Sequence, residues 1–249
     1  MNRLLSMSRW QSAAKSDMPM SDYKIIGIVI ARLDSSRLYG KALKSVDGLP
    51  LMGYVINRAK QVEGLAELVL ATTQREVDTP LCDYAASQGI AVYRGDLEDV
   101  ALRVLNCAKS RQADYFVRLN GDSPFIDPGI LTEAISRCIE DDADFVSNII
   151  ERSFPYGVSV EVVKTATYEK AYQEMTTSEE HEHVTKYLYS HLSSFKTVSL
   201  KCPYGNMESY RLVVDTEEDF SLFEKLVGVL GVHIHSANFQ EVVDALQVL

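Results

Sequence analysis

Residues 25–41 of the chain read IIGIVIARLDSSRLYGK, an apolar run followed at once by a loop rich in basic and hydroxyl side chains. An unbroken apolar run of this length is typical of a parallel strand that helices cover on both faces. We predict such strands at residues 25–30, 68–71, 91–93, 115–119 and 145–147. Segments with helical spacing of their apolar residues separate these runs. The alternation predicts an α/β fold whose mostly parallel, Rossmann-like sheet is flanked by helices.

The second half of the chain has a less regular pattern. We predict strands at residues 158–163, 196–200 and 211–214, and a helix at residues 178–191. Asp127 before Pro128 predicts a helix start, and Thr216 followed by three acidic residues predicts another, because a helix N-terminus favours capping oxygens and negative charge. No repeat or Pro/Gly-rich linker divides the chain. We therefore expect residues 23–249 to form one domain and residues 1–22 to be a disordered extension.

The composition excludes several classes of partner. The chain has 35 acidic and 25 basic residues, a formal net charge of −10, which argues against binding to nucleic acid or to an anionic membrane surface. Its apolar runs are far shorter than the roughly 20 residues that a helix needs to cross a bilayer. The 4 cysteines lie far apart and form no Cys-x-x-Cys pair. We therefore expect reduced thiols in a cytoplasmic protein that does not insert into membranes.

The loop after the first predicted strand is a basic island in this acidic chain. It holds three cations, Arg32, Arg37 and Lys41, against one carboxylate, Asp34. Ligands of open α/β sheets bind at the carboxyl ends of the strands, where this loop is expected. The loop lacks the glycines of a dinucleotide-binding fingerprint, and a P-loop would need glycine at Ser35. The side-chain charges are suited to a polyphosphate, although a solvated basic loop would have the same composition.

Two aspartates follow predicted strands in the same way. Asp122 comes shortly after the strand at residues 115–119, and Asp215 directly follows the strand at residues 211–214. Either one alone could be no more than a helix cap. If the two strands end at one edge of the sheet, the two carboxylates and the basic loop together are suited to Mg²⁺ and phosphate oxygens.

Ordered motifs from residue 23 to about residue 226 resemble one known family. The motifs are the loop at residues 31–41, Thr72-Thr73 with Asp78, residues 94–100 with Arg103, residues 118–124, Ser147-Asn148, residues 155–157 with Val160-Glu161, residues 182–185 and residues 211–219. Taken together, they resemble the cytidylyltransferases, in particular the SpsF-like branch of spore coat polysaccharide biosynthesis. That branch is related to CMP-sialic acid and CMP-Kdo synthetases.

The resemblance implies a GT-A-like nucleotidyltransferase fold and a Mg²⁺-dependent reaction. CTP and a sugar or sugar acid would give a CMP-sugar and pyrophosphate, for a surface polysaccharide or other glycan. Related synthetases form homodimers through an insertion, which matches residues 153–205 here. Within it, Phe154, Pro155 and Tyr156 offer apolar contacts.

The same resemblance implies roles for individual residues. For nucleotide binding, it implies Ala31, Arg32, Ser36, Arg37, Lys41, Thr72, Gly95, Arg103 and Asp122. For catalysis, it implies Lys41, Arg37, Asp122 and Asp215, with Asp122 and Asp215 as the metal ligands. For the sugar substrate, it implies Asn148, Tyr156, Glu161 and His183. No residue stands out as a general base.

Four positions depart from the family's pattern. Asp34 replaces a small residue and must face a cation or point away from the nucleotide; Tyr39 replaces proline, His181 replaces arginine, and Ser123 replaces cysteine. These departures keep open a non-catalytic nucleotide-sugar-binding or regulatory protein. Another nucleoside triphosphate, or a sugar 1-phosphate as acceptor, also remains open. A dinucleotide-dependent oxidoreductase ranks behind these, because the glycine fingerprint is absent.

Overall fold

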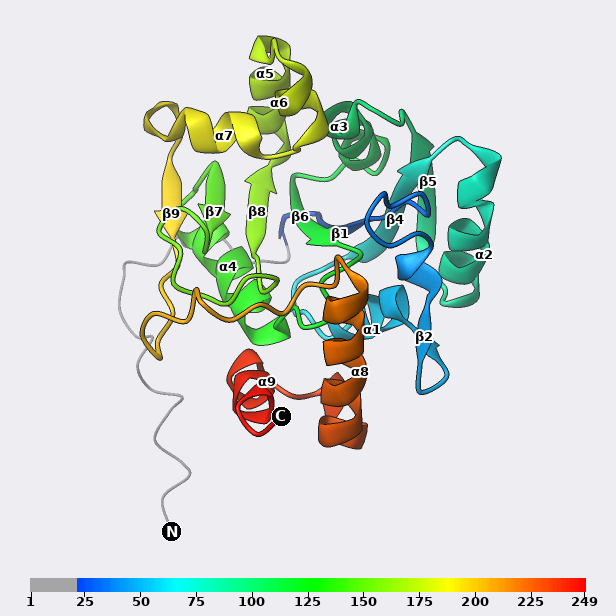
Figure 1. Cartoon of the computed structure of the whole chain (residues 1–249). Helices are drawn as coiled ribbons and strands as arrows, with labels where there is room; N and C mark the ends of the chain where they lie inside the picture. Colours follow the sequence, from blue (N-terminus) through cyan, green and yellow to red (C-terminus); the bar gives the residue numbers. More distant parts are fainter. Residues whose placement is uncertain (1–21) are drawn as a thin grey trace.

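A seven-stranded sheet forms the centre of the chain in the computed structural model, which describes residues 22–249 (Figure 1). The strands lie in the order β5 (Ala91–Gly95), β4 (Glu67–Thr73), β1 (Ile25–Ile30), β6 (Tyr115–Asn120), β8 (Glu161–Lys164), β7 (Phe145–Ser147) and β9 (Thr197–Ser199). β8 runs antiparallel to both of its neighbours, and all other neighbouring strands are parallel. This confirms the predicted mostly parallel sheet. The expected extension at residues 1–22 lies outside the described residues except for Asp22.

The central strand β1 explains why its sequence is an unbroken apolar run. Ile25 and Val29 pack with α1 (Leu51–Ala59), α2 (Thr79–Ser87) and α4 (Pro128–Glu140). Ile26 and Ile28 pack on the opposite face, with α3 (Val100–Ser110) and α5 (Thr165–Glu174). Since successive side chains of a strand point to opposite faces, a strand covered on both sides needs apolar residues at every position.

The remaining elements lie around this layered core. Two further groups lie at opposite ends of Figure 1: α6 (Ser178–Glu182) and α7 (Lys186–Ser190) beside α5, and α8 (Glu217–Leu230) beside α9 (Phe239–Leu246). A small hairpin, β2 (Ser45–Val46) and β3 (Leu49–Pro50), and the 3₁₀ turns η2 (Lys41–Leu43), η3 (Glu76–Asp78), η4 (Leu192–Ser194) and η5 (Gly231–His235) complete the elements. Of these described helices, none is both long and apolar enough to cross a membrane. The four cysteines are free.

Both predicted helix starts are confirmed. The Asp127 carboxylate accepts hydrogen bonds from the backbone N–H groups of Gly129 and Ile130, at 2.9 and 3.2 Å, and caps α4. Thr216 caps α8: its hydroxyl accepts from the N–H of Asp219, whose carboxylate accepts from the N–H of Thr216. Such reciprocal capping satisfies two donors that the first turn of a helix leaves free.

Three expectations about the second half were wrong in detail. Residues 211–214 form no strand, because their N–H groups bond to two separate segments: Leu212 N–H to the Tyr156 carbonyl at 2.6 Å, and Val214 N–H to the Asp122 carbonyl at 2.9 Å. The strand predicted at 158–163 begins only at Glu161. The helix predicted at 178–191 is two helices, because the backbone at His183 leaves the helical conformation, with ψ at 86°.

Candidate functional site

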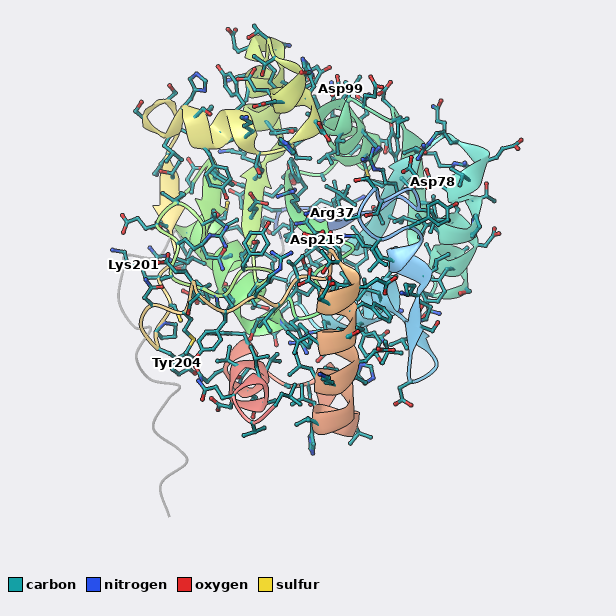
Figure 2. The ribbon with its side chains drawn as sticks, in the orientation of Figure 1. Arg37, Asp78, Asp99, Lys201, Tyr204 and Asp215 are labelled. Carbon is teal, nitrogen blue, oxygen red and sulfur yellow. The ribbon has the colours of Figure 1, made fainter. Side chains whose placement is uncertain are left out.

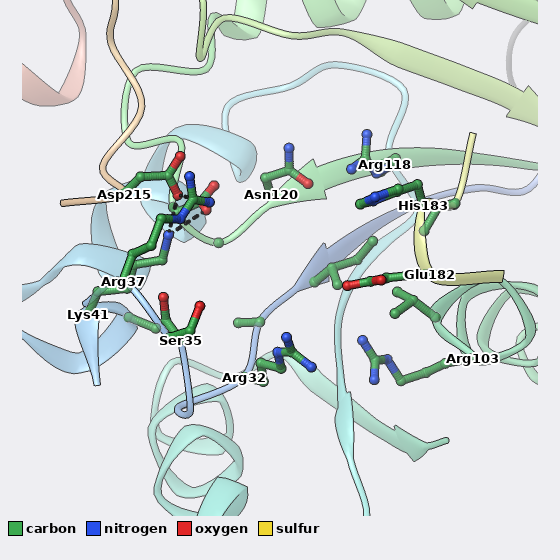
Figure 3. A pocket seen from close by; sticks show the side chains of 18 residues that line it. Arg32, Ser35, Arg37, Lys41, Arg103, Arg118, Asn120, Glu182, His183 and Asp215 are labelled. Carbon is green, nitrogen blue, oxygen red and sulfur yellow. Dashed lines mark hydrogen bonds and ion pairs between the residues drawn. The ribbon is translucent and has the colours of Figure 1, made fainter. Parts of the chain in front are cut away.

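A cavity of about 300 Å³ opens at the carboxyl ends of β1 and β6 (Figure 3). Its lining comes from the loop after β1, the end of β6, the start of α3, the α6–α7 connection and the segment before α8. The lining residues are Ile30, Ala31, Arg32, Ser35, Ser36, Arg37, Lys41, Ala42, Val100, Arg103, Arg118, Asn120, Gly121, Asp122, Glu182, His183, Val184 and Asp215. This is the edge of a parallel sheet at which α/β proteins bind their ligands.

One ammonium group joins both predicted metal aspartates. Lys41 Nζ lies 2.7 Å from Asp122 Oδ2, 2.8 Å from Asp215 Oδ1 and 2.9 Å from the Val214 carbonyl oxygen. Arg37 Nη2 lies 3.0 Å from the same Asp215 oxygen. Figure 2 places Arg37 and Asp215 together at the start of α8, and Figure 3 shows Arg37, Lys41 and Asp215 on one side of the cavity. The structure therefore brings together the four residues predicted to be catalytic.

The loop between β1 and Lys41 is held by a buried carboxylate. Asp78 is fully buried, and it accepts hydrogen bonds from the Leu33 N–H at 2.7 Å and from the Thr73 hydroxyl at the end of β4. At the far end of the loop, Gly40 has φ of +68°, a left-handed conformation that side-chain-bearing residues rarely adopt, and it leads into Lys41. Asp78 had no predicted role beyond its place in a motif, because a contact across 45 residues has no local signal.

Asp215 is ionised in a buried setting. Burial opposes ionisation of its carboxyl, but the hydrogen bond and charge of Lys41, together with Arg37 and Arg211, hold its pKa below the ordinary value. The Val214 N–H bonds to the carbonyl of Asp122 at 2.9 Å, so the backbones that carry the two aspartates are themselves joined. The cluster thus presents two fixed carboxylates to the cavity.

Asp34 faces cations, as its position beside a predicted phosphate site requires. It is bonded to Arg75, and its Oδ1 lies 3.5 Å from Nε of Arg32. The hydrogen bond from Arg75 and the charges of both arginines hold the pKa of Asp34 below its ordinary value, against a smaller effect of burial. The carboxylate is therefore paired with cations, and it is not among the residues that line the cavity.

Of the predicted base and ribose residues, Arg103 lies at the opposite side of the cavity from Lys41, and Thr72 and Gly95 are not among the lining residues. Arg103 lines the cavity, and its Nη1 donates to the Asp96 carbonyl at 2.6 Å. Burial lowers the pKa of its guanidinium. Gly95 ends β5 against the Arg103 side chain. Thr72 lies on β4, fully buried, and its hydroxyl has no hydrogen-bond partner among the described residues.

Of the four predicted sugar-binding residues, His183 reaches the cavity directly. Glu161 is only 2% exposed and lies behind Arg118. Arg118 lines the cavity and donates a hydrogen bond to the Glu161 carboxylate. Glu161 also accepts hydrogen bonds from the hydroxyls of Thr185 and Tyr189, at 2.7 and 2.8 Å. Because Glu161 already accepts hydrogen bonds from these three residues and is buried behind Arg118, we expect it to act on a ligand through Arg118.

The other two, Asn148 and Tyr156, are not brought into the cavity. The Asn148 side chain bonds to the Val158 carbonyl and the Val160 N–H, at 2.7 and 2.9 Å, and so fixes the chain before β8. The Tyr156 ring lies against the guanidiniums of Arg152 and Arg211. Their contact with a sugar stays a prediction.

The other departures from the family pattern also lie away from the lining. His181 pairs with Asp99 on the N-terminal side of α3, at 3.0 Å. The Tyr39 side chain is exposed, and Ser123 is buried beside Asp122.

Sequence reasoning did not assign roles to Arg118 and Asn120, although both line the cavity. A signal was available: residues two apart on a strand point to the same face, and Asn120 is the last residue of β6.

The donor set of the site fits a hard divalent cation. Two carboxylates, Asp122 and Asp215, converge on the Lys41 ammonium, and oxygen donors of this kind are those that Mg²⁺ prefers. Within residues 22–249, no group of three or more His, Cys, Asp or Glu side chains could hold a metal by itself. The other ligands would therefore be phosphate oxygens and water, as is usual for Mg²⁺.

Comparison with known proteins agrees with this geometry. A family model described as cytidylyltransferase matches residues 26–243. The spore coat polysaccharide biosynthesis protein SpsF of Bacillus subtilis is 29% identical over 221 residues, which cover 83% of this chain and 88% of that protein.

Two solved structures are similar over most of their length. A cytidylyltransferase from Leptospira borgpetersenii has a TM-score of 0.85 and 25% identity, covering 91% of this chain and 94% of the other. A CMP:2-keto-3-deoxy-manno-octonic acid synthetase complexed with CTP has a TM-score of 0.65 and 19% identity, covering 82% of this chain and 98% of the other. The second likeness shows the shared nucleotidyltransferase fold.

Proposed function

Because the chain belongs to the cytidylyltransferase family, we propose that it transfers CMP from CTP to a sugar or sugar acid and releases pyrophosphate. The product would serve the assembly of a surface polysaccharide or other glycan, as the role of SpsF in spore coat polysaccharide biosynthesis suggests. The observation that carries the proposal is the contact of Lys41 with both Asp122 and Asp215 inside a cavity lined by further cations. CTP as the nucleotide is supported by the complex of the structurally similar synthetase.

The cavity has two ends that suit the two parts of CTP. We assign Arg32, Ser36, Arg37 and Lys41 to the triphosphate, since charged and hydroxyl donors on one loop match a polyanion. Thr72, Gly95 and Arg103 are assigned to the base and ribose, and Ala31 to the nucleotide without a more specific role. The sugar would approach from the side of His183 and Arg118, with Glu161 holding Arg118 in place.

The reaction exchanges a phosphoanhydride bond of CTP for a phosphoester bond to the sugar. An acceptor hydroxyl of the sugar forms a bond from its oxygen to the α-phosphorus and gives up its proton to water. The bond from that phosphorus to the bridging oxygen breaks, and pyrophosphate leaves with the electron pair. Negative charge grows on the bridging oxygen as it leaves. Lys41 and Arg37 would stabilise that charge, because positioned cations contribute most to this class of reaction.

Asp122 and Asp215 are the residues that would hold Mg²⁺, for which their oxygens are suited. When bound, the ion supplies positive charge to phosphate oxygens and lowers the pKa of an oxygen that coordinates to it. We further propose that the protein works in the cytoplasm as a homodimer.

A substrate screen tests the proposal. The purified protein is incubated with CTP, UTP, ATP or GTP and a panel of sugars, sugar acids and sugar 1-phosphates, and pyrophosphate release and the nucleotide-sugar mass are measured. We expect release with CTP and a free sugar or sugar acid. Turnover with another nucleotide, or with a sugar 1-phosphate alone, would contradict the assignment. Nucleotide binding without turnover across the panel would favour the non-catalytic nucleotide-sugar-binding protein.

A further inference from the structure

Arg211 lies behind Asp215, outside the set of residues that line the cavity. The two oxygens of the Asp215 carboxylate have different partners. Oδ1 faces Lys41 and Arg37, at 2.8 and 3.0 Å, on the cavity side. Oδ2 accepts a hydrogen bond from Arg211 Nη2 at 3.1 Å. The guanidinium therefore holds the oxygen that is turned away from the site, and the other oxygen stays on the cavity side with Lys41 and Arg37.

Arg211 is itself fixed by a second aspartate. Its Nε and Nη2 donate to the two oxygens of Asp219, each at 3.0 Å, which is the bidentate geometry that a planar guanidinium favours. Asp219 also accepts from the backbone N–H groups of Asp215 and Thr216, at 2.9 and 3.2 Å. The capping box of α8 thus fixes both the backbone of Asp215 and the arginine that holds its side chain.

The ring of Tyr156, from the segment before β8, packs on the guanidinium of Arg211. Its ring centroid lies 5.0 Å from Arg211 Cζ, within the range of a cation–π contact. The ring is placed by backbone bonds that pair Tyr156 with the carbonyl of Tyr210 and the N–H of Leu212, at 2.8 and 2.6 Å. Gly157 allows this approach: it has φ of +103°, and a Cβ there would lie 2.5 Å from the Val213 nitrogen.

We propose that Arg211 is a positioning residue, which turns Asp215 so that Oδ1 faces the cavity and can act as a metal ligand. This inference rests on the metal role of Asp215 in the proposed function. The role depends on the planar fork, because only a guanidinium reaches Asp219 with two parallel bonds and Asp215 with a third. A lysine has the same charge but is a single point donor and cannot make this arrangement.

The test compares Arg211→Lys and Asp219→Asn with wild type and with Arg137→Lys. Arg137 forms an equivalent i,i+4 pair with Asp141 on α4, outside the site, and so controls for loss of an arginine–aspartate pair. Calorimetry measures CTP binding once with MnCl₂ and once with EDTA, and the ratio of the two affinities reports the contribution of the metal. Loss of a residue that orients a metal ligand typically weakens metal binding about 10–100-fold. We expect the ratio to fall about tenfold or more in both site variants, with unchanged CTP affinity in EDTA and an unchanged ratio in Arg137→Lys.

Two results separate failure of this inference from failure of the proposed function. A wild-type ratio in Arg211→Lys overturns the positioning role, and if that variant does not fold, a wild-type ratio in Asp219→Asn overturns it equally. Asp215→Asn is measured alongside. If the ratio of the two affinities falls in Asp215→Asn and in neither Arg211→Lys nor Asp219→Asn, Asp215 is a metal ligand and Arg211 does not position it. A wild-type ratio in Asp215→Asn contradicts the metal assignment itself.

Discussion

Lys41 Nζ lies 2.8 Å from Asp215 Oδ1, a buried contact between residues 174 positions apart in the chain. It joins the loop after β1 to the segment that precedes α8, which are the two parts of the site that come from the most distant regions of the sequence. The same ammonium also reaches Asp122 at 2.7 Å. A single side chain therefore joins the basic loop after β1 to both aspartates of the cavity.

Lys41→Met is expected to reduce turnover more than nucleotide affinity. The substitution removes the charge and roughly keeps the length of the side chain. Because negative charge on the bridging oxygen increases as pyrophosphate leaves, a cation there stabilises the transition state more than bound CTP. We expect kcat to fall about 10²–10³-fold, the usual cost of one such contact. Steady-state kinetics and the CTP dissociation constant are measured on the same preparation.

Arg32→Ala is the matched comparison for Lys41→Met. Arg32 also lines the cavity, but it lies on the exposed part of the loop and contacts neither Asp122 nor Asp215 within the described interactions. We expect weaker CTP binding and a smaller change in kcat. If Lys41→Met raises only the dissociation constant and leaves kcat intact, Lys41 is a binding residue and not a catalytic one.

Replacement of either proposed metal ligand, Asp122 or Asp215, by asparagine is expected to abolish metal-dependent turnover. Asp122→Asn and Asp215→Asn keep the shape of the side chain but remove the negative charge that attracts Mg²⁺. Initial rates are measured across a Mg²⁺ titration, and circular dichroism shows whether the fold is retained. Near-normal rates in both variants would exclude these carboxylates as the metal ligands.

The sheet was largely predictable because burial on both faces leaves a direct trace in the sequence. The apolar run at residues 25–30 is β1 with the same bounds, and β4, β5 and β6 continue to Thr73, Gly95 and Asn120 beyond their predicted ends. These extra residues are polar or glycine and so interrupt the apolar pattern, yet they still pair with the neighbouring strand. Residues 211–214 have a strand-like composition, but their hydrogen bonds to two different segments depend on the tertiary fold.

The site residues that could be predicted are those whose own charge and place after a strand indicate their chemistry. Arg37, Lys41 and Asp215 stood out as charges at the ends of predicted strands, and the structure brings them together. Asp78 and Arg211 did not, because each acts on a neighbour that the fold supplies. Their partners are the Leu33 N–H for Asp78 and the Asp215 carboxylate for Arg211.

Asp34→Asn is expected to destabilise the protein more at neutral pH than in acid. The folded state lowers the pKa of Asp34 through Arg75, so the carboxylate favours folding above its unfolded pKa, about 3.9. That contribution is lost as the pH falls through the lower folded value. Urea unfolding is measured at pH 7 and at pH 3, with Asp83→Asn as the control at an exposed aspartate of α2. An equal loss of stability at both pH values would contradict this origin.

Arg58→Met is expected to cost about 3–5 kcal/mol of unfolding free energy. The guanidinium is 1% exposed and donates to the carbonyls of Ile126, Ile234 and Ala237, at 2.6, 2.8 and 2.6 Å. Methionine fills similar space but leaves these buried carbonyls without a donor. Urea denaturation measures the loss, and Arg137→Met, which breaks a more exposed pair, should change stability by less than about 1 kcal/mol. A similar small change in Arg58→Met would show that water replaces the lost donors.

The proposed homodimer can be tested through the exposed aromatic residues of the segment at residues 153–205. Phe154 is only 2% exposed and packs on Phe239 within its own chain, so it cannot supply the contact expected from the sequence. Tyr156 and Tyr204 remain, at 44% and 52% exposed.

Aromatic side chains are enriched at protein interfaces, and a charge placed in a desolvated contact opposes association. Light scattering at micromolar concentration should give about twice the chain mass of 27.9 kDa for wild type, and a mass near 27.9 kDa for Tyr204→Glu. Val232→Glu, at an 86% exposed position on η5, should leave the dimer intact. A wild-type mass near 27.9 kDa would count against the dimer, and a dimeric Tyr204→Glu would place its interface outside this segment.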